Sequence, residues 1–515
     1  MVDGPLRGFN TEKINKLISF LEASRDDIPI PSMDVPIRAN LNPTDRFQAL
    51  STALIDLKRL KTALRKTADV IENAIVNVEE EAIPLSLQCG IRTLPGETIQ
   101  RIFELACEGG NGQDPGPHHK FPIKLSHINR RFRSLALQAP YIWANLSTQL
   151  TAEGLRAFIT RSKSVDLSIY IYDSSDAHGS GHGEPPLEDF LHTIIQHKER
   201  WSEFQYHRYS TNSDYGYSHP ALDAYRSLKL PRLQSLAYKK YNFCSIWEGS
   251  HRRQPRTFFA SWTMPKLYRF QGRNSPVPFK GIGKTLTTCT LHFASDGEDD
   301  ARNLYGSLEA LESIPQLKHL TLKLSDECKC SDAPLVRSIL LRQLVSFEID
   351  LAEALDWNLL TNLLSVLKMP MLLHMSAIVK VRGGDGDLIS FAIMSAAQEY
   401  PKLTTFALEA THMIFHDSVL VSLAESLPSL HEVSFRGLGL CEGNFLGRRQ
   451  PPSWRSLRVE GLGLADQKGV KKLVELMAKG PHWDDFRFYF VDRSGVSQVL
   501  PGLRLLLGDK LHYES

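Results

Sequence analysis

The sequence lacks long apolar runs, a strong net charge and a large number of cysteines. No stretch approaches the roughly 18–20 consecutive apolar residues that span a bilayer, and the first residues contain no apolar core of signal-peptide length. With 60 basic and 58 acidic residues, the formal net charge is +2, so charge alone predicts no attraction to nucleic acid. We therefore expect a soluble cytoplasmic or nuclear protein with no membrane and no nucleic-acid partner.

The 515 residues contain only seven cysteines, an odd number that predicts reduced thiols rather than a disulfide framework. Cys328 and Cys330 have no second pair at zinc spacing, so we predict no metal site there. A second set of metal-ligand side chains lies in a glycine-rich and serine-rich stretch that predicts a flexible loop. This set comprises Asp173, Asp176, His178, His182 and Glu184.

The sequence also lacks recognisable catalytic motifs. The glycine-rich stretches 109–116 and 382–387 have neither the lysine or third glycine nor the strand-to-helix context of a phosphate-binding loop. No G-x-S-x-G or H-E-x-x-H motif occurs. We predict no catalytic residues, no cofactor and no enzymatic activity. An enzyme with dispersed active-site residues is the alternative, and a deep pocket with titratable side chains would reveal it.

Two segments precede the middle of the chain. Residues 1–43 contain a short amphipathic stretch and then a proline-containing segment, which predicts an extended linker. In residues 44–82, apolar residues alternate in steps of three and four, with one break at Lys61, which predicts a long heptad-patterned helix with one apolar stripe. The stripe can pack against a helix of the same chain or pair with a second copy. Its residues are Phe47, Leu50, Leu54, Leu57, Leu64, Ala68, Ile71, Ile75 and Val78.

Two short amphipathic segments follow, at residues 93–108 and 125–146. Thr93 is a candidate helix cap and Pro95 suits a first helical turn. The helical faces that we expect comprise Ile99, Ile102, Phe103 and Ala106 in the first segment, and Leu125, Ile128, Phe132 and Leu135 in the second. Arg130, Arg131 and Arg133 fall on the solvated side. Because so small a unit buries little surface, some of these apolar residues must meet the rest of the chain or a partner.

The order of these features resembles the F-box of F-box proteins from mushroom-forming fungi. The shared features are leucine-proline-x-glutamate at 94–97, isoleucine-phenylalanine at 102–103, the second helical segment, and a proline followed by a tryptophan. A heptad helix also precedes the box in that group, and a strand like that at 158–171 follows it. Three residues differ from the usual pattern: Gly96, Asn129 and Phe132.

The resemblance implies that residues 83–150 form an F-box-like helical domain that docks on a Skp-type adaptor, and through it on a cullin, in a ubiquitin ligase of the SCF type. The contact or its immediate support would come from Leu94, Pro95, Ile99, Ile102, Phe103, Leu125, Ile128 and Phe132. A second hypothesis is a non-catalytic leucine-rich-repeat scaffold whose F-box-like segment packs internally.

A phrase recurs after residue 230. It consists of a proline, any residue, a leucine, two residues of any kind and an apolar residue, and variants keep the spacing without the proline. The anchor residues, most of them 24 to 34 residues apart, are Leu233, Leu267, Leu286, Leu317, Leu344, Leu372, Leu403, Leu430 and Trp454, and the phrase recurs around Leu503. Amphipathic helix candidates lie between several anchors, at 303–314, 355–367, 387–398 and 417–427.

This repetition predicts a unit of helix, sharp stop and short strand that is stable only when stacked on its neighbours. We expect an α/β fold in which the long helix and the small helical F-box are followed, over residues 151–515, by an irregular leucine-rich-repeat solenoid. An ordinary α/β domain with proline-initiated strands is the alternative. Because the strands of a solenoid line a surface suited to proteins, Lys318, His319 and Thr321 are candidate contacts with an unknown target protein.

Overall fold

The computed structural model describes residues 42–108, 120–174, 186–210, 220–242, 258–274, 284–294, 299–325, 337–351, 357–380, 396, 399–415, 427–440, 453–460, 471, 474–475, 477–480, 482–491 and 500–514. Nearly all of the N-terminal segment 1–43, Cys328 and Cys330, and both glycine-rich stretches lie outside these residues. So do most of the helices expected at 387–398 and 417–427 and, apart from Asp173, the metal-ligand set at 173–184.

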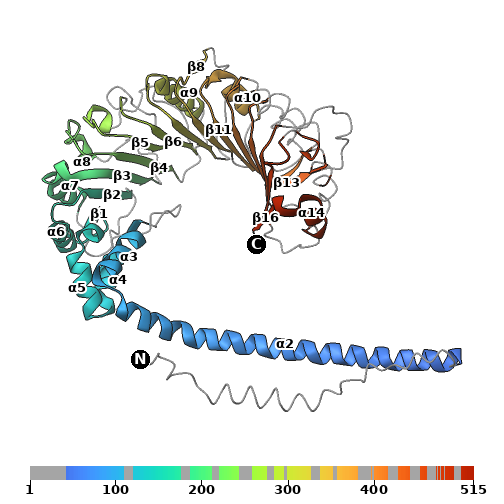
Figure 1. The fold of residues 1–515 in the computed structure, drawn as a ribbon. Coiled ribbons are helices and arrows are strands. Elements are labelled where there is room, and N and C mark those ends of the chain that lie inside the picture. The colour runs from blue at the N-terminus through green and yellow to red at the C-terminus, as the bar shows by residue number, and fades with distance from the viewer. Residues whose placement is uncertain are drawn as a thin grey trace. The chain divides into compact units, whose positions relative to one another are not determined.

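The chain divides into two units, residues 1–99 and 100–515. The first unit contains helix α2, Pro43–Thr93, of 51 residues (Figure 1). The expected helix at 44–82 is therefore present but longer, and residues 83–93 belong to it rather than to the short helices that follow. The helix continues through Pro84, although a proline in a helix interior removes one backbone hydrogen bond.

Thr93 does not have the capping role that the sequence predicted for it. The Thr93 hydroxyl donates a 2.8 Å hydrogen bond to the Gly90 carbonyl, so Thr93 ends α2 and does not cap the following helix. Helix α3 spans Gly96–Glu108, and its first turn closes with a 3.2 Å hydrogen bond from the Ile99 amide to the Pro95 carbonyl.

The second short segment forms two helices, α4 (Lys120–Ile128) and α5 (Arg130–Gln138), rather than the single helix that the spacing suggested. The break is Asn129, whose backbone is extended and whose Oδ1 accepts a 2.8 Å hydrogen bond from the Phe132 amide. Asparagine is among the best residues for this capping role. Helix α5 ends two residues before Pro140, and a short 3-10 helix, η1, spans Pro140–Trp143.

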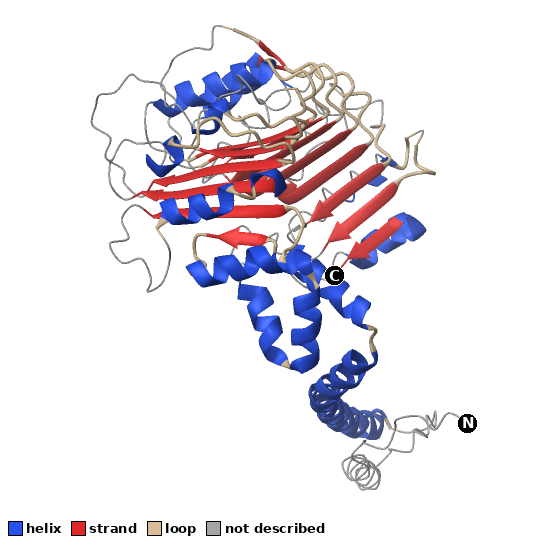
Figure 2. Ribbon diagram, turned by 90° about the vertical axis from the view of Figure 1, so that its left-hand side faces the viewer, coloured by secondary structure: helices blue, strands red, loops and turns tan. Residues whose placement is uncertain are grey.

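One parallel sheet dominates the second unit. Among the described residues it has fourteen strands, which lie side by side in chain order (Figures 1 and 2). They are β1 Asn145–Ser147, β2 Leu167–Ser174, β3 Trp201–Ser210, β4 Ser235–Asn242, β5 Arg269–Arg273, β6 Thr288–Phe293, β7 His319–Leu324, β9 Ser346–Leu351, β11 His374–Lys380, β12 Thr405–Phe415, β13 Glu432–Leu440, β14 Ser456–Glu460, β15 Arg487–Val491 and β16 Leu511–Glu514. Strands β8, Ile339–Leu340, and β10, Leu367–Lys368, pair separately.

Helices connect the strands, and α7, α9 and α10 lie on the outer side of the curved sheet in Figure 1. The helices are α6 Ala152–Arg161, α7 Leu187–Ile195, α8 Pro220–Asp223, α9 Asp299–Glu312, α10 Trp357–Val366 and α14 Leu500–Leu507, with 3-10 turns η2 Lys198–Arg200, η3 Phe258–Ser261 and η6 Gly508–Lys510. The helices predicted at 303–314 and 355–367 correspond to α9 and α10. The phrase around Leu503 does not start a strand: its leucine-rich run forms α14, because leucine is a strong helix former.

The nine anchor residues share one structural role. All are buried, and each lies two residues before a strand, as Leu372 does before β11. In seven of them the anchor amide donates to the carbonyl three residues earlier at 3.0 to 3.5 Å, which closes a tight turn. Six of these turns carry proline at their second position, where its fixed φ angle favours the turn. The repeated phrase is therefore the sequence of a turn that leads into a strand.

Successive turns are also joined to one another. The Lys318 carbonyl accepts hydrogen bonds of 2.9 Å from the amides of Val345 and Ser346, and the carbonyls of Leu373 and Thr404 bond the next turn in the same way. These bonds satisfy backbone groups that would otherwise be buried without partners. The fold is therefore mixed α/β, as expected, and is built on one large parallel sheet.

The two faces of the sheet differ in burial. In β7, Leu320, Leu322 and Leu324 are buried, whereas Thr321 and Lys323 are partly exposed, because side chains alternate between faces along a strand. The same alternation holds in β6 and β9. One face thus carries the apolar core, and we call the other the open face.

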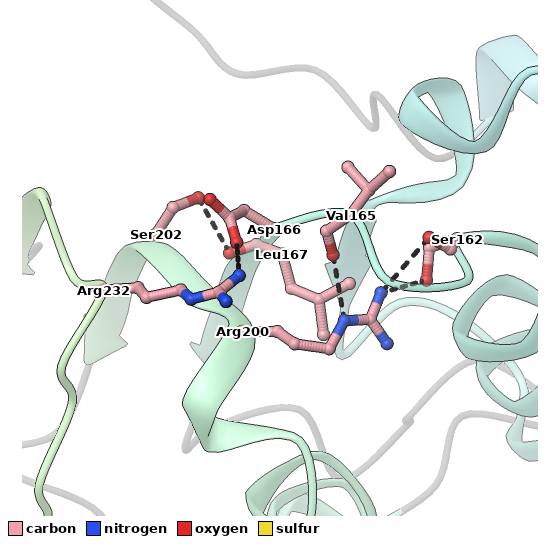
Figure 3. A network of polar contacts seen from close by, with 7 residues as sticks. All are labelled: Ser162, Val165, Asp166, Leu167, Arg200, Ser202 and Arg232. Carbon is pink, nitrogen blue, oxygen red and sulfur yellow. Dashed lines mark hydrogen bonds and ion pairs between the residues drawn. The ribbon is translucent and has the colours of Figure 1, made fainter.

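A polar network joins the loops before β2, β3 and β4 (Figure 3). Arg200 Nε donates to the Val165 carbonyl at 2.9 Å, and its Nη2 donates to the buried Ser162 hydroxyl at 2.8 Å. Arg232 pairs with Asp166 at 2.8 Å. Burial lowers the pKa of Arg200, the Asp166 charge raises it and the Arg232 charge lowers it. The network ties together the loops that lead into β2, β3 and β4.

Candidate functional site

The first candidate surface is the three-helix segment, which comprises α3, α4 and α5. Three of the residues predicted for adaptor contact, Ile99, Phe103 and Leu125, are buried. Phe103 packs edge-on against Phe132 with ring centroids 5.2 Å apart, and Gln100 Nε2 donates to the Leu135 carbonyl at 3.4 Å. The ring contact joins α3 to α5, so Phe103 lies in the support of the surface rather than on it.

Other apolar side chains of the segment face solvent. Ile102 is 49% exposed and Ile128 is 58% exposed, and both were predicted contact residues. Leu105 on α3 and Ile123 on α4 are also exposed, although the sequence did not single them out. Of the other predicted residues, Pro95 is exposed, and Leu94 and Phe132 are partly exposed. The segment therefore presents large aliphatic side chains on helices that have their own internal support.

Trp143 connects the three-helix segment to the rest of its unit. Its indole Nε1 donates a 2.7 Å hydrogen bond to the Ala136 carbonyl at the end of α5. The ring packs edge-on against Phe158 of α6 at 4.9 Å, and the Arg161 guanidinium lies 4.4 Å above the ring. This burial of an aromatic ring with a satisfied donor gives α5 a fixed position relative to the sheet.

Basic side chains accompany the exposed aliphatic ones. Arg130, Arg131 and Arg133 are all exposed, in agreement with their predicted solvated side. Arg133 Nε donates to the Ser126 carbonyl at 2.9 Å and so bridges α5 to α4. A polar and charged margin around aliphatic side chains is the usual anatomy of a protein-binding surface.

The second candidate surface is a row of charged side chains across the open face, which we call the charged row. Strand pairing places one residue of each strand side by side. From β3 to β14 these residues are His207, Lys239, Arg273, His292, Lys323, Asp350, Ile378, Glu409, Arg436 and Glu460. The row is basic on β4, β5 and β7 and rich in carboxylates from β9 to β14.

Both histidines of the charged row are held neutral. Burial, followed by the charge of Lys239, lowers the pKa of His207 to about 3. Burial and the charges of Arg273, Lys323 and Lys239 lower the pKa of His292 to about 4. Protonating either ring would add a cation to a surface that already carries several.

Aromatic rings flank the basic end of the charged row. Tyr209 and Tyr241 stack with centroids 4.7 Å apart, and the Arg273 guanidinium lies 4.5 Å above the Tyr241 ring. The Tyr170 hydroxyl donates to Glu203 at 3.2 Å, and burial together with the Glu203 charge raises the pKa of Tyr170. Rings and cations together favour contact with a polypeptide.

The other end of the row is joined by ion pairs between strands. Arg436 contacts Glu409 at 2.9 Å and Glu460 at 3.2 Å. Lys323 and Asp350 meet at 3.7 Å, where the basic and acidic parts adjoin. Such a network orders the side chains across the open face.

The residues predicted for target contact lie beside this row. Lys318 and His319 are exposed, and Thr321 points to the open face of β7 between Thr290 and Glu348. The sequence did not identify the charged row. A signal was nevertheless present, because every row residue from Lys239 onward lies six positions after an anchor residue, as Lys323 does after Leu317.

The described residues contain neither a metal-binding cluster nor a membrane-spanning helix. Within the described ranges, no group of three or more His, Cys, Asp or Glu side chains is placed to hold a metal ion. Asp173 is buried, and its carboxylate accepts a hydrogen bond from the Tyr206 hydroxyl. This bond gives the Asp173 carboxylate a structural role. None of the described helices is both long and apolar enough to cross a membrane.

No protein-family model matches this chain, and no curated protein matches it significantly.

Proposed function

We propose that this chain is a substrate-receptor subunit of a cullin-type ubiquitin ligase, as its resemblance to F-box proteins implies. The three-helix segment docks a Skp-type adaptor, and residues 151–515 form an irregular leucine-rich-repeat solenoid that binds a target protein. The observation that carries the proposal is the exposure of Ile102 and Ile128 on helices that already have a buried core. Apolar side chains exposed in this way are typical of a binding surface.

The solenoid part of the proposal rests on the repeated turn. Nine buried anchors precede strands that pair in chain order, and each turn bonds to the next one. Contacts between nearest neighbours are what a stacked repeat requires. The open face then offers a long surface on which several strands contribute one side chain each.

The charged row defines what kind of target fits. Lys239, Arg273 and Lys323 favour an acidic stretch of the target, whereas the carboxylates of β9 to β14 favour a basic one. Lys318, His319 and Thr321 would lie at the side of the bound segment. The chain itself does no chemistry in this account, because holding a target near a separate enzyme raises its effective concentration.

The competing function is a leucine-rich-repeat scaffold whose F-box-like segment packs internally. The burial of Phe103 and its ring contact with Phe132 favour it, since the helices already have internal packing. The two functions differ in what the exposed side chains do: the scaffold needs no partner for Ile102 and Ile128, whereas the receptor does.

Capture of the full chain by a purified Skp-type adaptor separates the two functions. The double variant Ile102→Ala with Ile128→Ala should lose capture while its thermal unfolding stays unchanged, because both side chains are already in solvent. Met371→Ala, which removes an equally large exposed side chain before β11, is the matched control and should keep capture. Undiminished capture by the double variant would contradict adaptor docking through these helices.

A further inference from the structure

The apolar stripe of α2 faces solvent along its length. With heptad positions lettered a to g, Phe47, Leu54, Lys61, Ala68 and Ile75 occupy position a, and Leu50, Leu57, Leu64, Ile71 and Val78 occupy position d. Every one of these residues is exposed in the single chain. A helix with an a/d stripe of this length, here broken at Lys61, buries the stripe by pairing with another helix.

We propose that α2 pairs with α2 of a second copy of this chain, in antiparallel orientation, to form a two-stranded coiled coil. The proposal is independent of adaptor docking, because it concerns α2 alone. Its evidence is the exposed stripe together with the charges beside it.

The charges beside the stripe select the orientation. At position e the sequence has Lys58 and Arg65 in one half of the helix and acidic residues at 72 and 79 in the other. In an antiparallel pair, position e of one helix faces position e of the other. Arg65 then lies next to Glu72 of the second copy, and Lys58 next to residue 79 of the second copy. Opposite charges across the flank of a coiled coil are what set partner and orientation.

This pairing also fixes one register. With Arg65 next to Glu72 of the second copy, Ala68 lies level with Ile71 of the second copy in the middle of the core. Residue 46 then lies level with residue 93, so nearly all of α2 overlaps. A shift by one heptad in either direction would set Arg65 against Arg65 or Glu72 against Glu72. Only one antiparallel register therefore combines full overlap with opposite charges.

A parallel pair fits the same helix less well. There, position e faces position g, and the g residues at 53, 60, 67 and 74 are uncharged in the sequence. The two copies of Lys61 would also face each other across the core. In the antiparallel register Lys61 lies level with Val78 of the second copy, so the two ammonium groups are far apart.

The oligomeric state of the full chain tests the pairing. Light scattering after size-exclusion chromatography should give a dimer, and Ile71→Asp should shift it to a monomer by placing two carboxylates near the middle of the seam. Val70→Asp is the matched control, since Val70 is 40% exposed and Ile71 is 37% exposed, and Val70 lies off the stripe. It should remain dimeric. A monomer at all concentrations, as when residues 1–41 or another protein cover the stripe, would overturn the proposal.

Charge reversal tests the orientation. Arg65→Glu and Glu72→Arg should each weaken the dimer about tenfold. Each change turns both of the dimer's Arg65–Glu72 ion pairs, which are of modest strength, into pairs of like charge. An equimolar mixture of the two variant chains should restore the wild-type affinity as a heterodimer, because both pairs again carry opposite charges. Circular dichroism confirms that each variant keeps its helix. Failure of the mixture to restore dimers would overturn the antiparallel arrangement.

Discussion

Trp143 and Ala136 are joined by a buried hydrogen bond of 2.7 Å from the indole Nε1 to the main-chain carbonyl. The bond links η1 to the end of α5, and the same ring packs on Phe158. Trp143→Phe should keep the ring contact and lose the bond, at a cost of about 1 kcal/mol in the free energy of unfolding. Trp143→Ala should cost about 3–5 kcal/mol because it leaves a cavity. Urea unfolding of the full chain measures both, and equal costs would contradict the assigned roles.

Asn129 is predicted to act as a helix cap. Asn129→Ala removes the acceptor for the Phe132 amide and should lower stability by about 0.5–2 kcal/mol. Asn129→Asp keeps an acceptor at the same place and should stay close to the wild type. Amide hydrogen exchange in the first turn of α5 reports the loss directly. If exchange at Phe132 is the same in all three proteins, the cap is not formed in solution.

The buried anchors are predicted to stabilise the sheet far more than their exposed neighbours do. Leu372→Ala should destabilise the protein by about 2–5 kcal/mol, since this side chain is fully buried two residues before β11. The adjacent Met371 is 42% exposed, and Met371→Ala should change stability by no more than about 0.5 kcal/mol. Thermal unfolding of the two variants side by side measures the difference. Comparable losses of stability in both variants would show that the buried anchors do not stabilise the turns.

Acid should destabilise the open face through its histidines. The folded-state pKa values of His207 and His292 are lowered to about 3 and about 4, below the ordinary value of 6.5. Between pH 6.5 and pH 4 the unfolded chain therefore binds more protons, and stability falls as pH falls, by at most about 1.4 kcal/mol per pH unit for each histidine. His292→Gln should flatten this dependence, because it removes one of the two histidines with a lowered pKa. An unchanged slope in His292→Gln would refute the assignment.

Much of the fold could be predicted because its local signals were strong. The 3-4 spacing of Leu50, Leu54 and Leu57 predicted a helix, and the structure has one. The recurring phrase predicted strand starts at the nine anchors, because its spacing marks the turn that leads into each strand, with or without the proline. Leu503 broke the rule because its leucine-rich surroundings favour a helix over a strand.

The candidate site was harder to predict because it depends on contacts between distant residues. The sequence placed Phe103 and Ile102 on one helical face, but only packing against Phe132 assigns Phe103 to the interior and leaves Ile102 in solvent. Likewise, the charged row can be recognised only when the register of nine strand pairs is known. Asn129 breaks the second predicted helix into two, because its side chain caps the helix that follows it.

Hydrogen–deuterium exchange of the full chain, with and without a purified Skp-type adaptor, tests the proposed function most directly. We predict that the adaptor slows exchange in residues 96–108 and 120–138, where Ile102, Leu105, Ile123 and Ile128 are exposed, and leaves β11 unchanged. Unaltered exchange in both helical segments at saturating adaptor would contradict the account.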